Sequence, residues 1–165
     1  MTSTKAVRIA KAGPEHVEAI SRLIELYRFR SSGGEAEGFL LPVKEDEVRE
    51  LVSEGRFFVA DVEGEFAGCV SLMEYDGIAE LRSLAVEERF QRRGIASKLI
   101  GRCREAARER GYGTLHTLTQ TYAAGAFEGA GFVRAPVPIP KLEKDCAYCP
   151  LHHNGCVEIP MTTRL

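Results

Sequence analysis

The sequence predicts an α/β fold (α+β) in which a mixed, mostly antiparallel sheet is flanked by about four helices. Three observations predict it. Apolar residues recur at steps of three and four residues in several segments, which is typical of amphipathic helices. Shorter runs rich in Phe and Val are separated by turn residues, which is typical of neighbouring strands. A chain of 165 residues with 44% hydrophobic content can bury one core, so we expect residues 1–165 to form a single domain.

The first part of the chain predicts one strand and two helices. Residues 6–10 read as a short strand, and Gly13-Pro14-Glu15 then supplies a break, a first-turn proline and an acidic residue, where a helix begins. The apolar stripe of this helix is Val17, Ile20, Leu23, Ile24 and Tyr27. Residues 31–43 open with a Ser-Ser-Gly-Gly run and are expected to be irregular. A second helix is expected over 44–54, where Val48, Leu51 and Val52 share a face.

The rest of the chain predicts an antiparallel hairpin followed by alternating helices and strands. The hairpin is formed by 56–62 and 66–73, with a Glu-Gly turn between them. The later strands are expected at 78–86, 115–119, 132–137 and 157–165, and a short helix at 123–128. A long helix before 115 carries the stripe Ala96, Leu99, Ile100, Cys103, Ala106 and Ala107. The predicted order is therefore βααβββαβαβ, with residues 138–165 adding a Cys-rich connection and a final strand.

Composition excludes several classes of partner. Lys and Arg number 22 against 24 Asp and Glu, a net charge of −2, so no global field attracts nucleic acid or an anionic membrane. Residues 1–11 lack the apolar run of a secretory signal, and no stretch approaches the length of a membrane span. We therefore expect a cytoplasmic protein. The five cysteines are an odd number and are read as reduced thiols or metal ligands.

The strongest functional signal is the segment 91–96. A phosphate-binding loop needs converging backbone N–H groups, a glycine where a Cβ would block close approach, and a helix N-terminus. Gly94 can approach a phosphate, Ala96 keeps the first helical turn slim, and two arginines add positive charge. The candidate cofactor-binding residues here are Gln91, Arg92, Arg93, Gly94, Ile95 and Ala96. Standing alone, this pattern is equally typical of a solvated basic turn.

Residues 80–86 followed by 91–96 resemble the acetyl-coenzyme A signature of the GCN5-related N-acetyltransferases (GNAT), Gln/Arg-x-x-Gly-x-Gly/Ala after an apolar strand. The predicted element order is also similar to that superfamily. The resemblance implies a GNAT sheet that splays at the cofactor site, where the strand 80–86 parts from 115–119. It further implies that acetyl-CoA is the cosubstrate and that its pantetheine arm pairs with backbone at Leu84, Ala85 and Val86. Homodimers are common in the family.

A closer similarity is to the small N-acetylglutamate synthase-like amino-acid acetyltransferases. It is carried by Leu40-Leu41-Pro42, Ala67-Gly68-Cys69, residues 80–86, Leu118-Thr119 and Gly131-Phe132. This resemblance implies a small-molecule acceptor amine, with glutamate as the first candidate. The synthases usually carry an arginine where this chain has Val43. Lys44 or Arg82 is therefore the candidate for binding the acceptor carboxylate.

Acetyl transfer to an amine needs a neutral nitrogen, so a positioned base should contribute about 10²–10⁴-fold. Glu80 is the candidate catalytic residue, because the resemblance implies a strand glutamate at this position that acts through water. The alternative is a solvated residue at a strand start. Many relatives supply a tyrosine as general acid where this chain has Phe127, so Tyr122 or water is left for that role. His116 is expected to be structural.

The C-terminal region carries a cysteine and histidine cluster of undecided purpose. Cys146, Cys149 and Cys156, with His152 or His153, would complete a tetrahedral zinc site, but one Cys-x₂-Cys pair alone is a weak zinc signal. The alternative is a loop whose reduced thiols pack as small hydrophobes. Residues 140–156 are interpreted as a lid over the acceptor in either case.

Three functions remain open from the sequence. The first is an acetyl-CoA-dependent N-acetyltransferase acting on a small acceptor such as glutamate. The second is a non-catalytic CoA-binding sensor or interaction module. The third is an enzyme that acetylates a protein N-terminus or a lysine, since one scaffold hosts many acceptors.

Overall fold

The computed structural model describes residues 5–32, 35–38, 40–75, 77–120, 124–135 and 158–165 of the chain. Its strands are β1 (Val7–Lys11), β2 (Arg30–Ser32), β3 (Glu35–Glu37), β4 (Phe57–Val62), β5 (Glu65–Tyr75), β6 (Ile78–Val86), β7 (Thr114–Gln120), β8 (Val133–Arg134) and β9 (Glu158–Arg164). Its α-helices are α1 (Val17–Leu26), α2 (Glu45–Ser53), α3 (Ile95–Glu109) and α4 (Ala124–Gly129). Short 3₁₀ turns, Pro14–His16 and Glu88–Phe90, precede α1 and the loop before α3.

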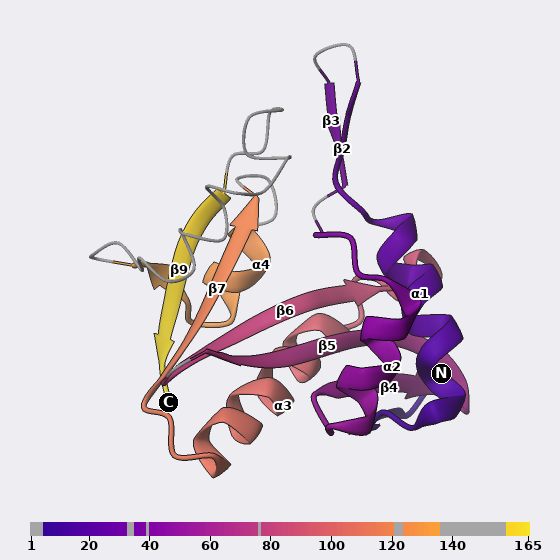
Figure 1. Cartoon of the computed structure of the whole chain (residues 1–165), viewed down its shortest axis with the longest axis horizontal. Coiled ribbons are helices and arrows are strands. Elements are labelled where there is room, and N and C mark those ends of the chain that lie inside the picture. The colour runs from indigo at the N-terminus through magenta and orange to yellow at the C-terminus, as the bar shows by residue number, and fades with distance from the viewer. Residues whose placement is uncertain (1–4, 33–34, 39, 76, 121–123, 136–157) are drawn as a thin grey trace.

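Seven strands form one sheet in the order β1-β4-β5-β6-β7-β9-β8 (Figure 1). β6 and β7 are parallel, whereas the other neighbouring pairs in this sheet are antiparallel. This confirms the predicted fold class, a mixed and mostly antiparallel sheet. β2 and β3 form a separate antiparallel hairpin that projects from the body of the molecule.

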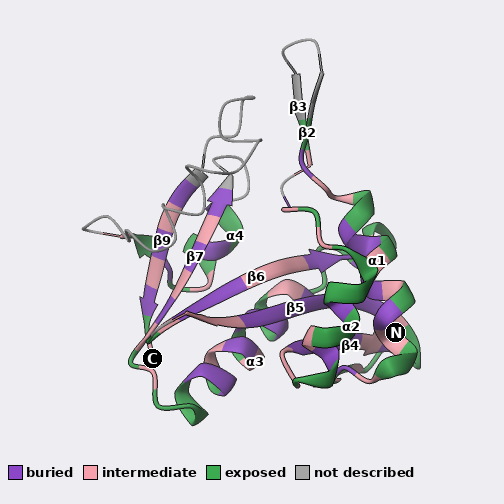
Figure 2. Cartoon of the chain, viewed as in Figure 1, coloured by how far each residue is buried: buried purple, intermediate pink, exposed green. Residues whose placement is uncertain are grey.

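The helices cover both faces of the sheet because each presents one apolar stripe. On one face, α1 and α2 pack buried residues such as Ile20, Leu23 and Val48 against β4 and β5. On the other, Leu99, Ile100 and the rest of the α3 stripe pack on β4, β5 and β6, and α4 joins this second cluster. Figure 2 shows β4, β5 and β6 as mostly buried between these layers.

β6 and β7 diverge soon after they meet. They are paired at Ala79 with Leu115 and at Glu80 with His116, and this register ends there within the described residues. Just beyond, the hydroxyl of Thr117 donates to the carbonyl of Leu81 at 3.0 Å. The two strands then separate toward their C-terminal ends (Figure 1), so the splay implied by the resemblance is present in this chain.

Several local expectations need correction. Residues 31–43 are not wholly irregular, because β2 and β3 lie within 30–37; strands of three residues are too short for an alternating pattern to be recognised. The first helix is preceded by a 3₁₀ turn, so α1 starts at Val17. In α3 it is Ile95, rather than Ala96, that lies in the core. The strand expected at 132–137 is described only at 133–134, as an edge strand.

Gly101 lies in the middle of α3 and is exposed, and a Cβ added there would meet nothing within 4 Å. Glycine in a helix interior costs about 0.5–1 kcal/mol relative to alanine. Gly101→Ala is therefore expected to raise the free energy of unfolding by about this amount. Urea denaturation of the two proteins measures it, and an unchanged or lower midpoint would contradict the expectation.

In the portion of the chain that the structure describes, no helix combines the length and the apolar character needed to cross a membrane.

Candidate active site

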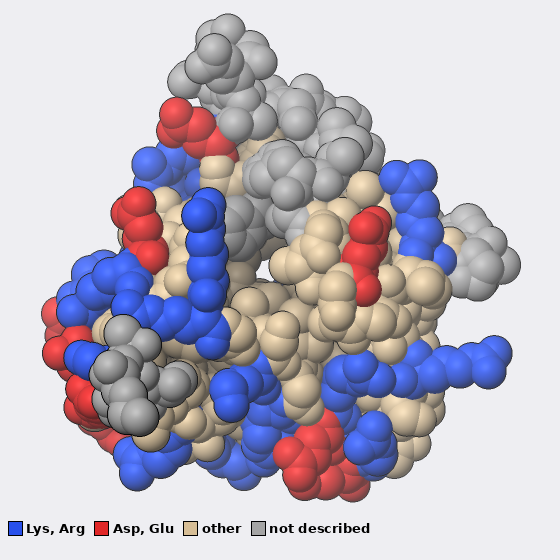
Figure 3. Space-filling model, turned by 180° about the vertical axis from the view of Figure 1, so that it is seen from behind, with Lys and Arg blue, Asp and Glu red and all other residues tan. Residues whose placement is uncertain are grey.

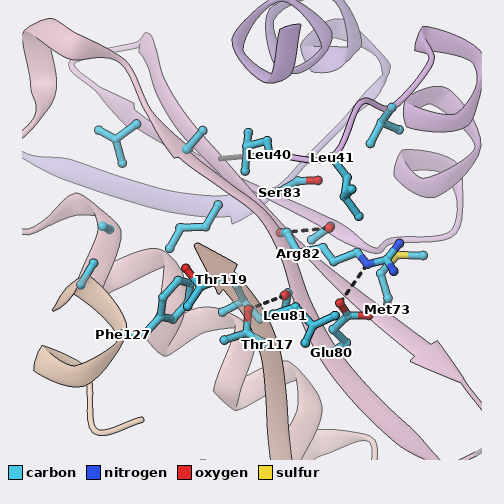
Figure 4. A pocket seen from close by; sticks show the side chains of 18 of the residues that line it. Leu40, Leu41, Met73, Glu80, Leu81, Arg82, Ser83, Thr117, Thr119 and Phe127 are labelled. Atoms are coloured by element: carbon cyan, nitrogen blue, oxygen red, sulfur yellow. Dashed lines mark hydrogen bonds and ion pairs between the residues drawn. The ribbon is translucent and has the colours of Figure 1, made fainter. Parts of the chain in front are cut away.

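The divergence of β6 and β7 opens a cleft of about 580 Å³. One wall comes from the segment before α2 and from α2 itself, including Leu41, Val43 and Leu51. The floor is β6 with Ser71 and Met73 of β5, and the far wall comes from β7 and α4. Figure 4 shows side chains from these elements facing one another across β6. The cleft is mostly apolar, with a few polar groups, as small-molecule sites usually are.

A β-bulge shapes β6 where it borders the cleft. Between the pairs Cys69–Ala85 and Ser71–Arg82, β5 has one residue and β6 has two, and Ser83 adopts a left-handed φ of 51°. The carbonyls around this bulge are still satisfied. The Ser71 hydroxyl donates to the Arg82 carbonyl at 3.1 Å, and the Cys69 thiol donates to the Ser83 carbonyl at 3.3 Å. The buried side chains of β5 therefore hold the irregular strand in place.

The segment between β6 and α3 has the backbone that an anion-binding loop requires. Arg92 has a φ of 63°, and Gly94 has a φ of 75° at the N-cap of α3. A Cβ at Gly94 would meet nothing within 4 Å, so glycine is needed there for its conformation rather than for space inside the protein. Arg92 and Arg93 are exposed beside this helix N-terminus. Positive charge and the helix dipole thus favour an anion at the same place.

The side chain of Gln91 anchors the start of this loop. Its Nε2 donates to the carbonyl of Val86 at 3.0 Å and to the hydroxyl of Tyr27 at 2.9 Å. Tyr27 follows α1 as its C-cap residue and is half-buried. The sequence pattern placed Tyr27 in the apolar stripe of the helix, whereas its hydroxyl reaches the loop before α3.

Glu80 lies deep in the cleft. Its side chain is 2% exposed, and its Oε1 accepts a hydrogen bond from Arg82 Nε at 3.0 Å (Figure 4). The Arg82 guanidinium also lies 5.4 Å from the centre of the Tyr75 ring. The contact at 3.0 Å fixes the orientation of the Glu80 carboxylate in the cleft.

His116 lies across the parallel pair from Glu80. Burial lowers the pKa of His116, so its ring is uncharged at neutral pH. The described cysteines are not nucleophiles at neutral pH, because burial raises the pKa of both Cys69 and Cys103 to about 12.

The structure gathers most of the candidate residues from the sequence around one cleft. Seven of them line it, namely Glu80, Arg82, Leu84, Ala85, Val86, Gln91 and Ala96. Arg92, Arg93 and Gly94 are exposed on the loop, and Ile95 is buried in the core behind it. Lys44 is exposed at the N-cap of α2 and does not line the cleft, whereas its neighbour Val43 does.

Several lining residues were not found from the sequence. Ser71 and Thr117 are buried polar residues within apolar strands. The signal that could have identified them is a polar residue inside a segment that the strand pattern predicts to be buried. Glu47 gave no signal, because acidic residues in the first turn of a helix are common for capping reasons. Phe127, at the position of the usual tyrosine, is buried against Phe132 with ring centroids 5.3 Å apart and also lines the cleft.

The cysteine-rich segment lies outside the described residues. This applies to Cys146, Cys149 and Cys156, to His152 and His153, to the proposed lid at 140–156, and to Tyr122. Within the ranges that the structure does describe, no group of three or more His, Cys, Asp and Glu side chains is placed to hold a metal ion.

Figure 3 shows the molecule from behind, with basic and acidic side chains interspersed around a hollowed centre. Among the described residues, those that border the hollow are mainly uncharged. On this face Lys and Arg cover more of the surface than Asp and Glu, although the whole chain carries a net charge of −2.

Comparison with known proteins found relatives in sequence and in fold. A model of the acetyltransferase (GNAT) family matches residues 20–132. A protein of Chlorobaculum tepidum, described as an uncharacterized N-acetyltransferase, is 31% identical over 167 residues, which cover 99% of this chain and 97% of that protein.

Two solved structures are similar in fold. The N-acetylglutamate synthase of Neisseria gonorrhoeae, complexed with coenzyme A and N-acetyl-glutamate, matches with a TM-score of 0.77 and 20% identity. That match covers 97% of this chain but 35% of the synthase, so this chain spans about a third of that protein. Rv2747 of Mycobacterium tuberculosis, in complex with CoA and NLQ, matches with a TM-score of 0.76 and 22% identity, covering 96% of this chain and 99% of that one. At these identities the two structures establish the fold.

Proposed function

This chain belongs to the acetyltransferase (GNAT) family, and from that premise we propose that it acetylates the amine of a free amino acid, with glutamate as the first acceptor to test. Family membership makes the protein an N-acetyltransferase whose cosubstrate is acetyl-CoA. The identity of the acceptor and the roles of individual residues are the content of the proposal.

The cofactor side of the cleft fits acetyl-CoA. Gly94 and the positive φ at Arg92 form a cradle at the start of α3, and the described part of β6 beyond Glu80 is no longer paired with β7. In this proposal, residues 91–96 hold the pyrophosphate, and Leu84, Ala85 and Val86 hold the pantetheine arm through their backbone. Bound there, acetyl-CoA would supply an activated acetyl group, and backbone N–H groups of β6 would polarise its carbonyl.

Glu80 is the proposed general base, and its position in the cleft is the main observation that supports this mechanism. The carboxylate is buried in the cleft, on the strand that would hold the thioester, and is oriented by Arg82. Directly or through one water molecule, it would take the proton that the acceptor amine must lose. Phe127 has no proton to give. Because an ordinary thiol has a pKa of about 8.5, water suffices to protonate the departing thiolate.

Arg82 supports an acceptor that carries a carboxylate. Among the described residues that line the cleft, Arg82 is the basic one, and it lies next to the proposed base. An amino acid bound with its amine at Glu80 would bring its carboxylate close to this guanidinium, which suits carboxylate recognition. The N-acetyl-glutamate in the complex of the gonococcal synthase is consistent with this acceptor class. Lys44, exposed and next in sequence to the lining residue Val43, is the second candidate.

An acceptor screen tests the proposal. Purified protein is given acetyl-CoA and a panel of free amino acids, polyamines and short peptides, and released thiol is measured. Thiol release with glutamate or another amino acid is the expected result. Thiol release with peptides or lysine side chains, and not with free amino acids, would show that the acceptor is a peptide or protein amine. Binding of CoA without turnover on any member of the panel would favour a CoA-binding sensor.

A further inference from the structure

Tyr27 and Gln91 form a contact between two segments that are 64 residues apart in the sequence. A side-chain amide has two N–H donors, and in Gln91 Nε2 reaches both Val86 at the end of β6 and Tyr27 at the end of α1. Two acceptors on one amide fix the position of the side chain more firmly than one would. The start of the cofactor loop is therefore tied to two separate elements of the fold.

The backbone of Tyr27 is itself held on both sides. Its N–H donates to the carbonyl of Leu23 at 3.2 Å, and its carbonyl accepts from the N–H of Leu40 at 3.1 Å. Leu40 lies in the wall of the cleft, so Tyr27 connects that wall to the cofactor loop. Burial and the nearby carboxylate of Glu88 raise the pKa of Tyr27, so the hydroxyl remains neutral at physiological pH.

The loop depends on such an anchor because its own residues are exposed. Gln91, Arg92, Arg93 and Gly94 are all solvent-accessible, and two of them have left-handed backbone conformations. A loop that must present converging N–H groups binds an anion more tightly when its conformation is fixed before binding.

Resting on the proposed function, we propose that Tyr27 is a positioning residue for the pyrophosphate of acetyl-CoA. Through its hydrogen bond to Gln91, it holds the loop 91–96 in the binding conformation. Its effect is on the phosphate-bearing half of the cofactor, because its hydroxyl contacts Gln91 in the loop, whereas the hydrogen bond from Gln91 to the Val86 carbonyl does not involve Tyr27.

Isothermal titration with CoA tests this in the full chain. Tyr27→Phe removes the hydroxyl and keeps the ring. It is expected to raise the Kd for CoA about five- to tenfold, which corresponds to the free energy that one hydrogen bond usually contributes. Gln91→Ala should raise it by at least as much. In the Gln91→Ala background, Tyr27→Phe should add less than about twofold, because its effect passes through Gln91.

Two controls separate positioning from a general structural effect. Titration with pantetheine, which lacks the pyrophosphate, should give the same Kd for the wild type and Tyr27→Phe. Tyr112→Phe removes a tyrosine hydroxyl that donates to Glu74 Oε2 at 2.7 Å, away from the cleft, and should leave the Kd for CoA unchanged.

An unchanged Kd for CoA in Tyr27→Phe would overturn the proposal while leaving the proposed function intact. Equal weakening of CoA and pantetheine, or additive effects in the double variant, would overturn it as well. Failure of the wild-type protein to bind CoA would instead remove the proposed function on which this inference rests.

Discussion

Replacing Glu80 with glutamine is expected to lower kcat/KM for acetyl transfer by about 10²–10⁴-fold, the usual contribution of a positioned base. Glutamine keeps the size of the side chain and an oxygen that can accept from Arg82 Nε, so the geometry of the cleft should survive. It cannot take the proton of the acceptor amine. The loss should be largest at lower pH, where more of the amine is protonated. Initial rates across a pH series measure both effects.

Glu74→Gln is the matched control for Glu80→Gln. Glu74 is also a strand glutamate that accepts from arginines, with Arg56 at 3.1 Å and Arg110 at 2.6 Å, but it does not line the cleft. The hydrogen bond from Tyr112, followed by the charge of Arg110, lowers the pKa of Glu74, so this carboxylate stabilises the fold at neutral pH and loses that contribution as the pH falls. Glu74→Gln should therefore affect stability more than kcat/KM. An unchanged pH profile in Glu80→Gln would remove Glu80 from the mechanism.

Replacing Gly94 with alanine is expected to raise the Kd for CoA about tenfold or more. A left-handed conformation costs an L-residue about 1–2 kcal/mol, and the residue at this position has a φ of 75°. Alanine would shift the loop away from this φ, and in the proposed binding mode its N–H groups would then no longer converge on the phosphate. Titration with CoA measures the change.

Gly101→Ala is the control for this variant, since it makes the same substitution inside the helix that Gly94 caps. Gly101 has ordinary helical backbone, and its replacement should leave the Kd for CoA as it is. Equal CoA affinity in the wild type and Gly94→Ala would contradict the proposed contact between the backbone at Gly94 and the pyrophosphate.

The sequence was sufficient for the elements with long apolar stripes. Residues 17–24 and 99–107 repeat at helical spacing over two turns or more, and both segments form the helices expected, with their stripes in the core. The strand at 78–86 has the bounds that the pattern indicated. Such segments can be predicted because one periodicity of apolar residues continues long enough to outweigh the secondary-structure preferences of single residues.

The features of the site that the sequence did not predict depend on contacts between residues far apart in the chain. No spacing relates Tyr27 to Gln91, and no pattern shows that Ser71 would reach the Arg82 carbonyl. The β2 strand was not predicted for a local reason: its three residues are too few to show an alternating pattern. The separation of β6 from β7 beyond Glu80 was expected from the family resemblance alone. Periodicity indicates which face of a sheet a residue lies on, but it does not indicate which strands are paired.

The brief pairing of β6 with β7 makes the sheet two half-sheets joined at one vertex. β1, β4, β5 and β6 form one half, and β7, β9 and β8 form the other. Any change in the angle between the halves displaces the strand ends in proportion to their distance from that vertex. Glu80, paired there with His116, would move least, while the ends of the strands would move most. The distance between the strand ends is thus set by the angle between the halves, whereas the place of Glu80 is set by the junction itself.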